Sequence, residues 1–414
     1  MNPVTSPIAT RADAEAADAA DVLAPIRDRF VVPSGLYLDG NSLGALPDGV
    51  AAAVTEAVTG AWGRDLIASW NDNGWWTLPG RVGNRIGALI GAAPGQVMCG
   101  DSTSVQLFQA LVGLGRANPR RRVLAVDAGD FPTDRYLTDS AARLLGLTVE
   151  RVDPNRFVPD DRIAVVAFSA VNFATGELRD LAEITDSVHA AGGLMCWDLS
   201  HAAGALPVDL DGLRADAAVG CTYKYLCGGP GSPAYLYVAA RHHAALDLPL
   251  VGWHGHADPF AMADDYRPAV GIERARIGTP PVLSMVATEA ALAVWDGVAL
   301  SDVRAKSLAL TDLAFSFADT HLAPHGVEVV TPRPHHRRGS QVALRVTHAY
   351  ELSRALIARG VTGDFRPPDI VRLGMAPLYL RHVDVWDAMD ILASVLAEGA
   401  HLDPAFARSD DAVT

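Results

Sequence analysis

Four short apolar segments constrain the fold of this chain more than any other feature of its sequence. They span residues 123–127, 163–169, 194–198 and 217–221, and each ends in a polar residue or a cysteine. Apolar residues fill consecutive positions in them, which is typical of strands that are buried on both faces. The sequence therefore predicts an α/β fold with a mostly parallel central sheet and helices on both faces.

A helix is predicted between the second and third segments. Leu181, Ile184 and Val188 recur at helical spacing within residues 180–191, and Gly192 follows as a residue that can end a helix. A helix between two strands is the usual connection between parallel neighbours in a sheet. The pattern therefore supports a strand–helix–strand unit in the middle of the chain.

Polar side chains follow the apolar segments at one edge of the predicted sheet. Asp127, Ser169 and Asp198 end three of the segments, and Lys224 comes shortly after the fourth. Ligands of such sheets bind beyond the carboxyl ends of the strands. A lysine and a carboxylate at this edge suit pyridoxal phosphate (PLP), which forms a Schiff base with a lysine while an anion faces its ring nitrogen. Singly, Asp198 would be interpreted as a turn cap and Lys224 as a surface residue, and their pairing favours the cofactor.

Other residues at this edge could also contact such a cofactor. Ser102, Thr103 and Ser104 open a predicted helix, so their hydroxyls, the free backbone amides and the helix dipole could bind a phosphate. An ordinary hydroxyl cap is the alternative. Phe131 could stack on a flat ring, although a single phenylalanine is more often part of the core. His201 could tune Asp198 or be structural, and we favour tuning slightly.

Composition restricts the class of protein and its partners. A chain of 414 residues that is 50% hydrophobic can bury a large core. The formal net charge of −14 and the lack of a long basic run argue against nucleic acid as a partner. The apolar segments are too short to cross a bilayer, and residues 1–22 lack the apolar core of a signal peptide. We expect neither a nucleic-acid nor a membrane partner.

The cysteines and histidines give no sign of a metal site. Histidines cluster at residues 242–243, 254–256 and 335–336, without carboxylates or thiolates at ligand spacing. The cysteines include no Cys-x-x-Cys pair, so free buried thiols in a reducing cytoplasm are preferred over disulfides. They are Cys99, Cys196, Cys221 and Cys227.

The chain is predicted to fold in three parts. An N-terminal segment (residues 1–50) packs on the small domain, residues 51–300 form the large cofactor-binding domain, and residues 301–414 form a small C-terminal α+β domain. The small domain is predicted from strand-like and helix-like segments after residue 300. Strands are expected at residues 327–330 and 341–346, and a helix at residues 349–359.

Eight motifs in order resemble kynureninase, a PLP-dependent hydrolase of the aspartate aminotransferase fold (fold type I). The similarity spans residues 36–392, and the order of the motifs makes it specific. The motifs are residues 37–44 (Tyr-Leu-Asp-Gly-Asn-Ser-Leu-Gly), 69–72 (Ser-Trp-Asn-Asp), 131–134 (Phe-Pro-Thr-Asp), 198–201 (Asp-Leu-Ser-His), 223–226 (Tyr-Lys-Tyr-Leu), 252–256 (Gly-Trp-His-Gly-His), 278–281 (Gly-Thr-Pro-Pro) and 363–369 (Gly-Asp-Phe-Arg-Pro-Pro-Asp).

The resemblance implies a role for each matched residue. Lys224 would form the Schiff base and move protons, Asp198 would pair with the pyridine nitrogen, and Phe131 would stack on the ring. Arg372 would bind the substrate α-carboxylate, for which a planar bidentate group is suited, and Tyr223 would carry a proton near Cβ. The remaining implied cofactor contacts are Thr103, Ser104 and Tyr223 at the phosphate, Pro132, Thr133, Asp134, Ser169 and His201 around the cofactor, and Trp253 and Thr279 from the second subunit.

The implied reaction is hydrolysis of the Cβ–Cγ bond of L-kynurenine or 3-hydroxy-L-kynurenine. Its products are anthranilate or 3-hydroxyanthranilate and L-alanine, formed at the subunit interface of a cytoplasmic homodimer. Thr279 stands where some relatives have asparagine, and His254 stands where others have residues such as phenylalanine. Both are expected near the aryl end of the substrate. The preference between kynurenine and its 3-hydroxy form therefore stays open. The pathway also stays open between tryptophan catabolism, NAD cofactor biosynthesis and a specialised route.

Two other classes of function remain as alternatives. A class V aminotransferase or a cysteine desulfurase would share the aspartate and the lysine. A desulfurase needs a reactive cysteine on a loop well after the lysine, whereas the last cysteine here is Cys227. A binding protein that has lost catalysis is the second alternative, and such proteins typically lose the lysine or the aspartate, both of which are present.

Overall fold

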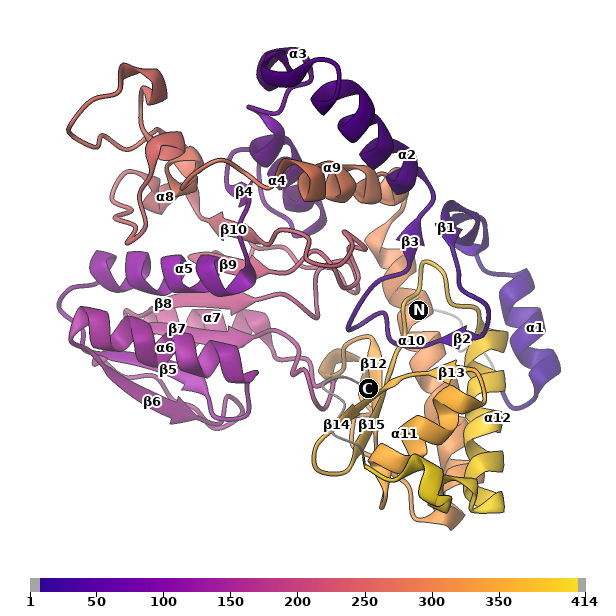
Figure 1. Cartoon of the computed structure of the whole chain (residues 1–414). Helices are drawn as coiled ribbons and strands as arrows, with labels where there is room; N and C mark the ends of the chain where they lie inside the picture. The colour runs from indigo at the N-terminus through magenta and orange to yellow at the C-terminus, as the bar shows by residue number, and fades with distance from the viewer. Residues whose placement is uncertain (1–7, 409–414) are drawn as a thin grey trace.

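The computed structural model describes residues 8–408, so residues 1–7 of the predicted N-terminal segment and residues 409–414 of the predicted small domain lie outside the described residues. A seven-stranded sheet forms the centre of the larger part of the molecule (Figure 1). The strand order is β4-β10-β9-β8-β7-β5-β6. The strands are β4 (Val97–Cys99), β5 (Val123–Asp127), β6 (Thr148–Val152), β7 (Ile163–Ser169), β8 (Leu194–Asp198), β9 (Ala217–Gly220) and β10 (Tyr235–Val238).

The sheet is mostly parallel, as the unbroken apolar segments predict. Strands β6, β5, β7, β8 and β9 run parallel to one another, whereas β10 pairs antiparallel with both β9 and β4. The first three predicted strands have the bounds of β5, β7 and β8, and the fourth ends at Gly220, one residue earlier than predicted. Strands β4, β6 and β10 were not predicted, because β4 and β10 are only three and four residues long and β6 is partly exposed.

Helices cover both faces of this sheet. Cys196 of β8 packs in the same apolar cluster as residues of α5 (Thr103–Ala117) and α6 (Pro132–Leu145), whereas Trp197 packs with Val188 of α7 (Leu181–Ala190). Successive side chains of a strand point to opposite faces, so α5 and α6 lie on one face and α7 on the other (Figure 1). The predicted helix of residues 180–191 is therefore confirmed as α7.

A second, antiparallel sheet follows in the C-terminal part, with the order β11-β12-β15-β14. Helices α10, α11 and α12 lie beside it in Figure 1. The predicted strands at residues 327–330 and 341–346 are confirmed as β11 and β12, and the predicted helix at residues 349–359 is confirmed as α11. The elements are α10 (Leu300–Phe317), β11 (Glu328–Val329), β12 (Gln341–Arg345), α11 (Ala349–Ala358), β13 (Val361–Thr362), β14 (Asp364–Arg366), β15 (Ile370–Gly374) and α12 (His382–Glu398).

The remaining elements connect the two sheets or border them. Strand β2 pairs in parallel with β13, so a segment near residue 36 joins the C-terminal part. No single helix within residues 8–408 has the length and hydropathy to cross a bilayer. One pair of consecutive helices in this range reaches that length and hydropathy together, but the pair is bent by 84°. These elements are α1 (Arg11–Ala19), β1 (Phe30–Val31), β2 (Leu36–Tyr37), β3 (Leu46–Pro47), α2 (Gly49–Glu56), α3 (Ser69–Asp72), α4 (Leu78–Leu89), α8 (Ala240–His243) and α9 (Val282–Ala291).

Buried ion pairs attach the N-terminal segment to helices α10 and α12. The Lys306 ammonium lies 2.6 Å from the Asp21 carboxylate, and these side chains are only 5% and 7% exposed. Asp18 accepts hydrogen bonds from the backbone amide of His382 (2.6 Å) and from that of Val383 (3.0 Å). These contacts fix α1 against α12. The division of the chain at residues 50 and 300 stays a prediction.

Replacing Asp21 with asparagine should destabilise the protein strongly. The change leaves the buried Lys306 ammonium without its counter-charge, and breaking a buried ion pair in this way costs about 3–5 kcal/mol. Urea unfolding should show a clearly lower midpoint than the original protein. The matched control is Asp387→Asn, which removes the partly exposed pair with Arg11 and should change the midpoint little. Equal shifts for the two variants would contradict the prediction.

Candidate active site

The carboxyl ends of the parallel strands bring the predicted polar residues to one edge. Ser169, the last residue of β7, is in register with Asp198, the last residue of β8. The backbone amide of Ala170 donates to the Asp198 carbonyl at 2.8 Å, and the Asp198 side chain accepts from the Ser200 amide at 2.6 Å. Asp198 therefore lies at the end of a rigid strand, as predicted, with a carboxylate that a turn holds in place.

Lys224 lies in the turn after β9 and contacts His201. The Lys224 Nζ atom is 2.9 Å from Nε2 of His201, and it lies 5.8 Å from the centre of the Tyr223 ring. Burial, followed by the positive charges of Lys224 and Arg372, holds the pKa of His201 well below its usual value. A neutral imidazole can accept a hydrogen bond from the lysine. The ring bonds to the lysine, and the tuning of Asp198 by His201 stays a prediction.

The N-terminal segment packs closely on the lysine turn. The Gly44 amide donates to the Tyr223 carbonyl at 2.8 Å. A Cβ atom on Gly44 would collide with the Lys224 carbonyl and with Cys227, so only glycine permits this approach. The motif at residues 37–44 therefore helps to fix the position of Lys224.

The chain contains only two lysines, Lys224 and Lys306. Lys306 is buried in its ion pair with Asp21, away from the carboxyl edge of the large sheet. Lys224 is thus the single lysine that can serve a ligand at this edge.

Three buried carboxylates surround this edge. Burial, with the charges of Asp198 and Asp130, raises the pKa of Asp134 well above its usual value. Burial and the charges of Asp198 and Asp127 likewise raise the pKa of Asp130 to about 6. Asp134 Oδ2 is buried and has no hydrogen-bond partner among the described residues. Like charges held this close do not all ionise near neutral pH, so the site retains a proton on its acids.

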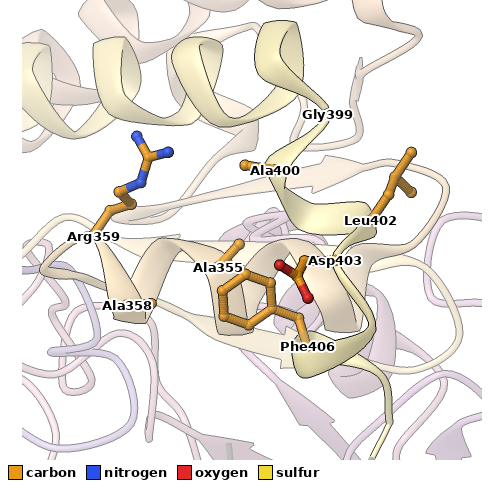
Figure 2. A pocket seen from close by; sticks show the side chains of 8 residues that line it. All are labelled: Ala355, Ala358, Arg359, Gly399, Ala400, Leu402, Asp403 and Phe406. Carbon is orange, nitrogen blue, oxygen red and sulfur yellow. The ribbon is translucent and has the colours of Figure 1, made fainter.

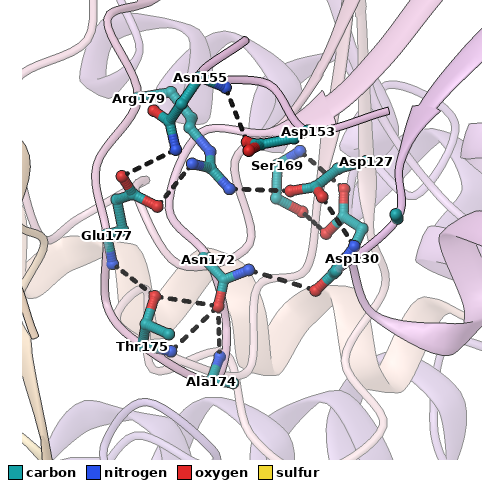
Figure 3. A network of polar contacts seen from close by, with 12 residues as sticks. Asp127, Asp130, Asp153, Asn155, Ser169, Asn172, Ala174, Thr175, Glu177 and Arg179 are labelled. Carbon is teal, nitrogen blue, oxygen red and sulfur yellow. Dashed lines mark hydrogen bonds and ion pairs between the residues drawn. The ribbon is translucent and has the colours of Figure 1, made fainter. Parts of the chain in front are cut away.

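A polar network fixes the loops around these acids (Figure 3). Asp130 accepts from the Ser169 amide at 3.0 Å and from the Ser169 hydroxyl. Arg179 bridges Asp127 at 2.8 Å and Glu177 at 2.6 Å. Glu177 in turn pairs with Arg337, which precedes β12. The network therefore ties the loop after β7 both to the large sheet and to the C-terminal part.

The start of α5 is the predicted phosphate site, and its anion binding stays a prediction. Ser102 caps the helix by accepting from the Val105 amide at 3.3 Å, so the hydroxyl-cap interpretation also holds. Thr103 and Ser104 form the first turn, whose amides have no partner within the helix. The Asp101 carbonyl accepts from the Ala234 amide at 2.9 Å, which joins this helix start to the segment after Lys224.

Phe131 precedes α6 at the same edge. Its side chain is 44% exposed, and its ring meets that of Phe173 edge-on at 5.2 Å. Pro132 and Thr133 form the first turn of α6. An exposed aromatic face beside the acids leaves room for a flat ligand ring.

Arg372 lies on β15, in the small sheet, and its guanidinium is fully buried. It donates to Asp364, to the Ser42 hydroxyl at 3.1 Å and to the Phe173 carbonyl. Its positive charge reaches His201, whose pKa it lowers. Arg372 is thereby connected to Phe131 through Phe173, and it acts on His201 through its charge.

Trp253 and Thr279 lie in a different environment. Trp253 packs in an aromatic cluster, defined here as Trp70, Trp76, Trp253, His254 and Phe260. Its side chain is 42% exposed. Thr279 is also exposed and lines a narrow pocket beside Gly100 and Asp101.

His254 is buried at the centre of the aromatic cluster. Arg276 donates to its Nδ1 at 2.9 Å, so the neutral ring carries its proton on Nε2. Burial and the Arg276 charge lower the pKa of His254 to about 4. His254 is therefore a neutral part of the cluster at neutral pH.

A separate pocket lies between α11 and the turns after α12, away from all predicted site residues (Figure 2). Arg359 and Asp403 lie at it with Ala355, Leu402 and Phe406. Arg359 is already paired with Glu398 at 2.6 Å. The pocket does not belong to the site at the sheet edge.

The residues at the sheet edge fit PLP. A lysine, a strand-end carboxylate and a helix N-terminus match its aldehyde, ring nitrogen and phosphate. Asp134 Oδ2 and His201 Nδ1 are buried polar atoms that find no hydrogen-bond partner within residues 8–408, and a ligand can satisfy them. Asp130, Phe173 and Asp364 were missed by sequence reasoning, although Asp130 directly precedes the recognised motif at residues 131–134.

Solved structures with a similar fold include an enzyme that carries PLP. A cysteine desulfurase from Thermococcus onnurineus NA1 aligns with a TM-score of 0.75 at 17% identity, covering 90% of this chain and 98% of that chain. A C-DES mutant solved with glycine covalently linked to its PLP cofactor aligns with a TM-score of 0.77 at 16% identity, covering 89% and 98%. These likenesses confirm the expected PLP-dependent transferase-like fold (fold type I), and at such identity they show the fold alone.

Sequence comparison separates this chain from the desulfurases. The family described as Kynureninase C-terminal domain matches residues 303–392. A kynureninase from Burkholderia pseudomallei (strain 1106a) is 46% identical over 408 residues, which cover 96% of this chain and 98% of the relative. A kynureninase from Pseudomonas fluorescens is 44% identical over 397 residues, covering 94% and 95%. At this identity over almost its full length, the chain belongs to the kynureninase family.

Proposed function

We propose that this chain hydrolyses the Cβ–Cγ bond of L-kynurenine, or of its 3-hydroxy form, with PLP as its cofactor. The products are anthranilate, or 3-hydroxyanthranilate, and L-alanine. The observation that carries the proposal is the contact of Lys224 with His201 at 2.9 Å, at the sheet edge that Asp198 also occupies. The relatives named kynureninase, at 44–46% identity, support the same reaction.

PLP, when bound, supplies an electron sink that makes the substrate Cα acidic and activates the bonds beyond it. Lys224 would hold the cofactor covalently and, once the substrate amine has replaced it, take the proton from Cα. His201 accepts a hydrogen bond from the Lys224 amine and so orients it. Asp198 would face the ring nitrogen, and Phe131 would lie against the ring. The phosphate would be held by Thr103, Ser104 and Tyr223, with Pro132, Thr133 and Ser169 nearby.

The buried acids Asp130 and Asp134 would help Asp198 to pair with a positively charged ring nitrogen. Asp130 and Asp134 both have raised pKa values, so they hold a proton more readily than ordinary carboxylates. A proton retained on this pair reduces repulsion of the Asp198 carboxylate and leaves that carboxylate free to pair with a cationic ring. Asp134 would therefore act beside Asp198 as a neutral hydrogen-bonding group.

Tyr223 would donate a proton near the substrate Cβ. The charge of Cys221, together with burial, raises the pKa of its hydroxyl above the ordinary value, so it stays protonated at neutral pH. Water adds to the γ-carbonyl carbon, the Cβ–Cγ bond breaks, and Cβ then needs a proton to become the methyl group of alanine. Arg372 would bind the α-carboxylate that stays on the alanine half.

We also propose a homodimer in which Trp253 and Thr279 enter the site of the neighbouring subunit. Support comes from the exposed apolar side chains near Trp253: Phe260 is 68% exposed, Met262 is 75% exposed and Val270 is 89% exposed. Such a patch is typical of a protein interface. His254 and Thr279 would then border the aryl group and set the choice between the two kynurenines.

A cytoplasmic location and a place in tryptophan catabolism complete the proposal. All four cysteines are buried free thiols, as predicted, which suits a reducing compartment. Kynurenine is a product of tryptophan breakdown, and the 3-hydroxy product would also serve NAD biosynthesis.

Reduction with borohydride should attach the cofactor to Lys224 only. Peptide mapping can separate the two candidates, because Lys306 is the sole other lysine and provides an internal control. Lys224→Ala should abolish both the label and anthranilate release, which its fluorescence reports. A label at Lys306, or kynurenine hydrolysis by the Lys224→Ala protein at the original rate, would refute the proposal.

Mixed dimers should test whether Trp253 serves the neighbouring subunit. Equal amounts of Lys224→Ala and Trp253→Ala chains, unfolded and refolded together, form hybrids in which one site contains both original residues. About one quarter of the original activity should then return, since half the dimers are hybrids with one intact site of two. No recovery above either variant alone would place Trp253 in the site of its own chain. Co-refolding each variant with itself is the control.

Asp130 should make stability depend on pH between about 4 and 6. Its pKa is raised to about 6 in the folded state, so its contribution is fully present below pH 4 and is lost as pH rises through 6. The loss amounts to at most about 3 kcal/mol, from roughly two pKa units. In urea unfolding, the free energy of unfolding of Asp130→Asn should rise relative to that of the original protein as pH increases over this range, because asparagine cannot ionise. The exposed Asp161→Asn is the control, and a constant offset for Asp130→Asn would contradict the assignment.

A further inference from the structure

Asp364 and Arg372 form a cross-strand pair in the interior of the small sheet. They are directly opposite each other in the antiparallel register of β14 and β15. Their side chains are 4% and 1% exposed. Two strands of one sheet therefore determine where the guanidinium lies, and water has little access to the pair.

Asp364 occupies one edge of the Arg372 guanidinium. Nε donates to Asp364 Oδ1 at 2.9 Å and Nη2 donates to Asp364 Oδ2, which is a bidentate contact with the Nε–Nη2 edge. Nη2 also donates to the Ser42 hydroxyl at 3.1 Å, and Nη1 donates to the Phe173 carbonyl. Four of the five N–H groups are thus used, and one N–H of Nη1 is left.

The Phe173 carbonyl and the Ser42 hydroxyl, which bond to Nη1 and Nη2 of Arg372, can give up these bonds. The Phe173 carbonyl also accepts from Gln341 Nε2 at 2.9 Å, and the Ser42 hydroxyl also donates to Asp364 at 3.1 Å. Neither group would lose its last hydrogen bond if a ligand took the Nη1 and Nη2 hydrogens. Asp364 would keep Arg366 and Ser42 as donors to Oδ2, but within residues 8–408 its Oδ1 is bonded to Arg372 alone.

The charges around the pair suit one added carboxylate. Arg366 lies 2.6 Å from Asp364 and supplies a second cation, so Arg372, Arg366 and Asp364 carry a net charge of plus one. Asp39 also faces this group, and burial together with the Asp364 charge raises its pKa to about 6. Below about pH 6, where Asp39 is mostly protonated, a single substrate carboxylate balances the cluster.

We propose that Asp364 is a positioning residue, which holds Arg372 by its Nε–Nη2 edge so that the Nη1–Nη2 end receives the α-carboxylate of the substrate. The inference rests on the proposed role of Arg372 in the kynureninase reaction. It differs from a purely structural role, because loss of Asp364 should weaken binding of groups that carry an α-amino-acid carboxylate. It also differs from competition, in which Asp364 would occupy Arg372 at the expense of the substrate.

Steady-state kinetics of the holoenzyme separates these roles. Asp364→Asn should raise the KM for L-kynurenine about 10- to 100-fold, the range expected when a hydrogen-bonded charge pair is weakened, with a much smaller change in kcat. Inhibition by the product L-alanine should weaken in parallel. The control is Asp369→Asn, the same change in the turn between the two strands, where the carboxylate is 40% exposed and faces Arg345 at 3.4 Å. That variant should retain the original KM.

A double-mutant comparison distinguishes failure of the inference from failure of the proposed function. Arg372→Ala should raise KM, and Asp364→Asn should add little in that background. An unchanged KM for Arg372→Ala would remove Arg372 from substrate binding. A raised KM for Arg372→Ala with an unchanged KM for Asp364→Asn would overturn the inference, and a lowered KM for Asp364→Asn would show competition instead.

Binding of cofactor and folding provide the remaining readouts. Asp364→Asn should retain PLP, measured by absorbance after dialysis, and should unfold in urea near the midpoint of the Asp369→Asn control. If Asp364→Asn does not fold, Asp364→Glu keeps the buried charge but moves the guanidinium, and it should show the same rise in KM. A folded Asp364→Glu protein with the original KM and original inhibition by L-alanine would also overturn the inference.

Discussion

The close approach of acids to one lysine at the carboxyl edge of the large sheet is the constraint on which the rest of the site depends. Asp198 is placed there by the end of β8, Asp130 by the loop before α6 and Asp134 by the first turn of α6. The cation that faces them is Lys224. Because burial makes each negative charge costly, this arrangement is stable only if acids share protons or a ligand brings positive charge. A cofactor with a protonated ring nitrogen meets that requirement.

The small sheet contributes the second half of the site through backbone and charge. Arg372 on β15 donates to the Phe173 carbonyl, and the Phe173 ring meets Phe131 at 5.2 Å. The loop after β7 is also held by Glu177, which pairs with Arg337 of the C-terminal part. One connected group of contacts therefore holds both Phe131 and Arg372, so in the proposed function a shift of either sheet would move the ligand ring and the substrate carboxylate together.

The fold and the reaction are determined by different parts of this molecule. Cysteine desulfurases share the fold at 17–19% identity with a TM-score of 0.75, and the C-DES mutant shares it at 16% identity with a TM-score of 0.77. The fold by itself is therefore compatible with several reactions. In the proposed function, His201, Tyr223 and the aromatic cluster with His254 would distinguish the chemistry, because they would contact the parts of a substrate that differ between reactions.

Sequence alone determined the parallel strands, helix α7 and the edge where polar residues gather, because unbroken apolar segments and helical spacing report burial directly. The ordered motifs also identified the family, and Lys224 and Asp198 followed from their places after strands. Tertiary structure decided what sequence spacing cannot express: that His201 bonds to Lys224, that Asp130 holds Ser169, and that Asp364 takes one edge of Arg372. These contacts join residues that are far apart in the chain or lie on different strands. Their distances depend on strand register, on packing and on protons that the acids share. All three are set only when the two sheets are assembled.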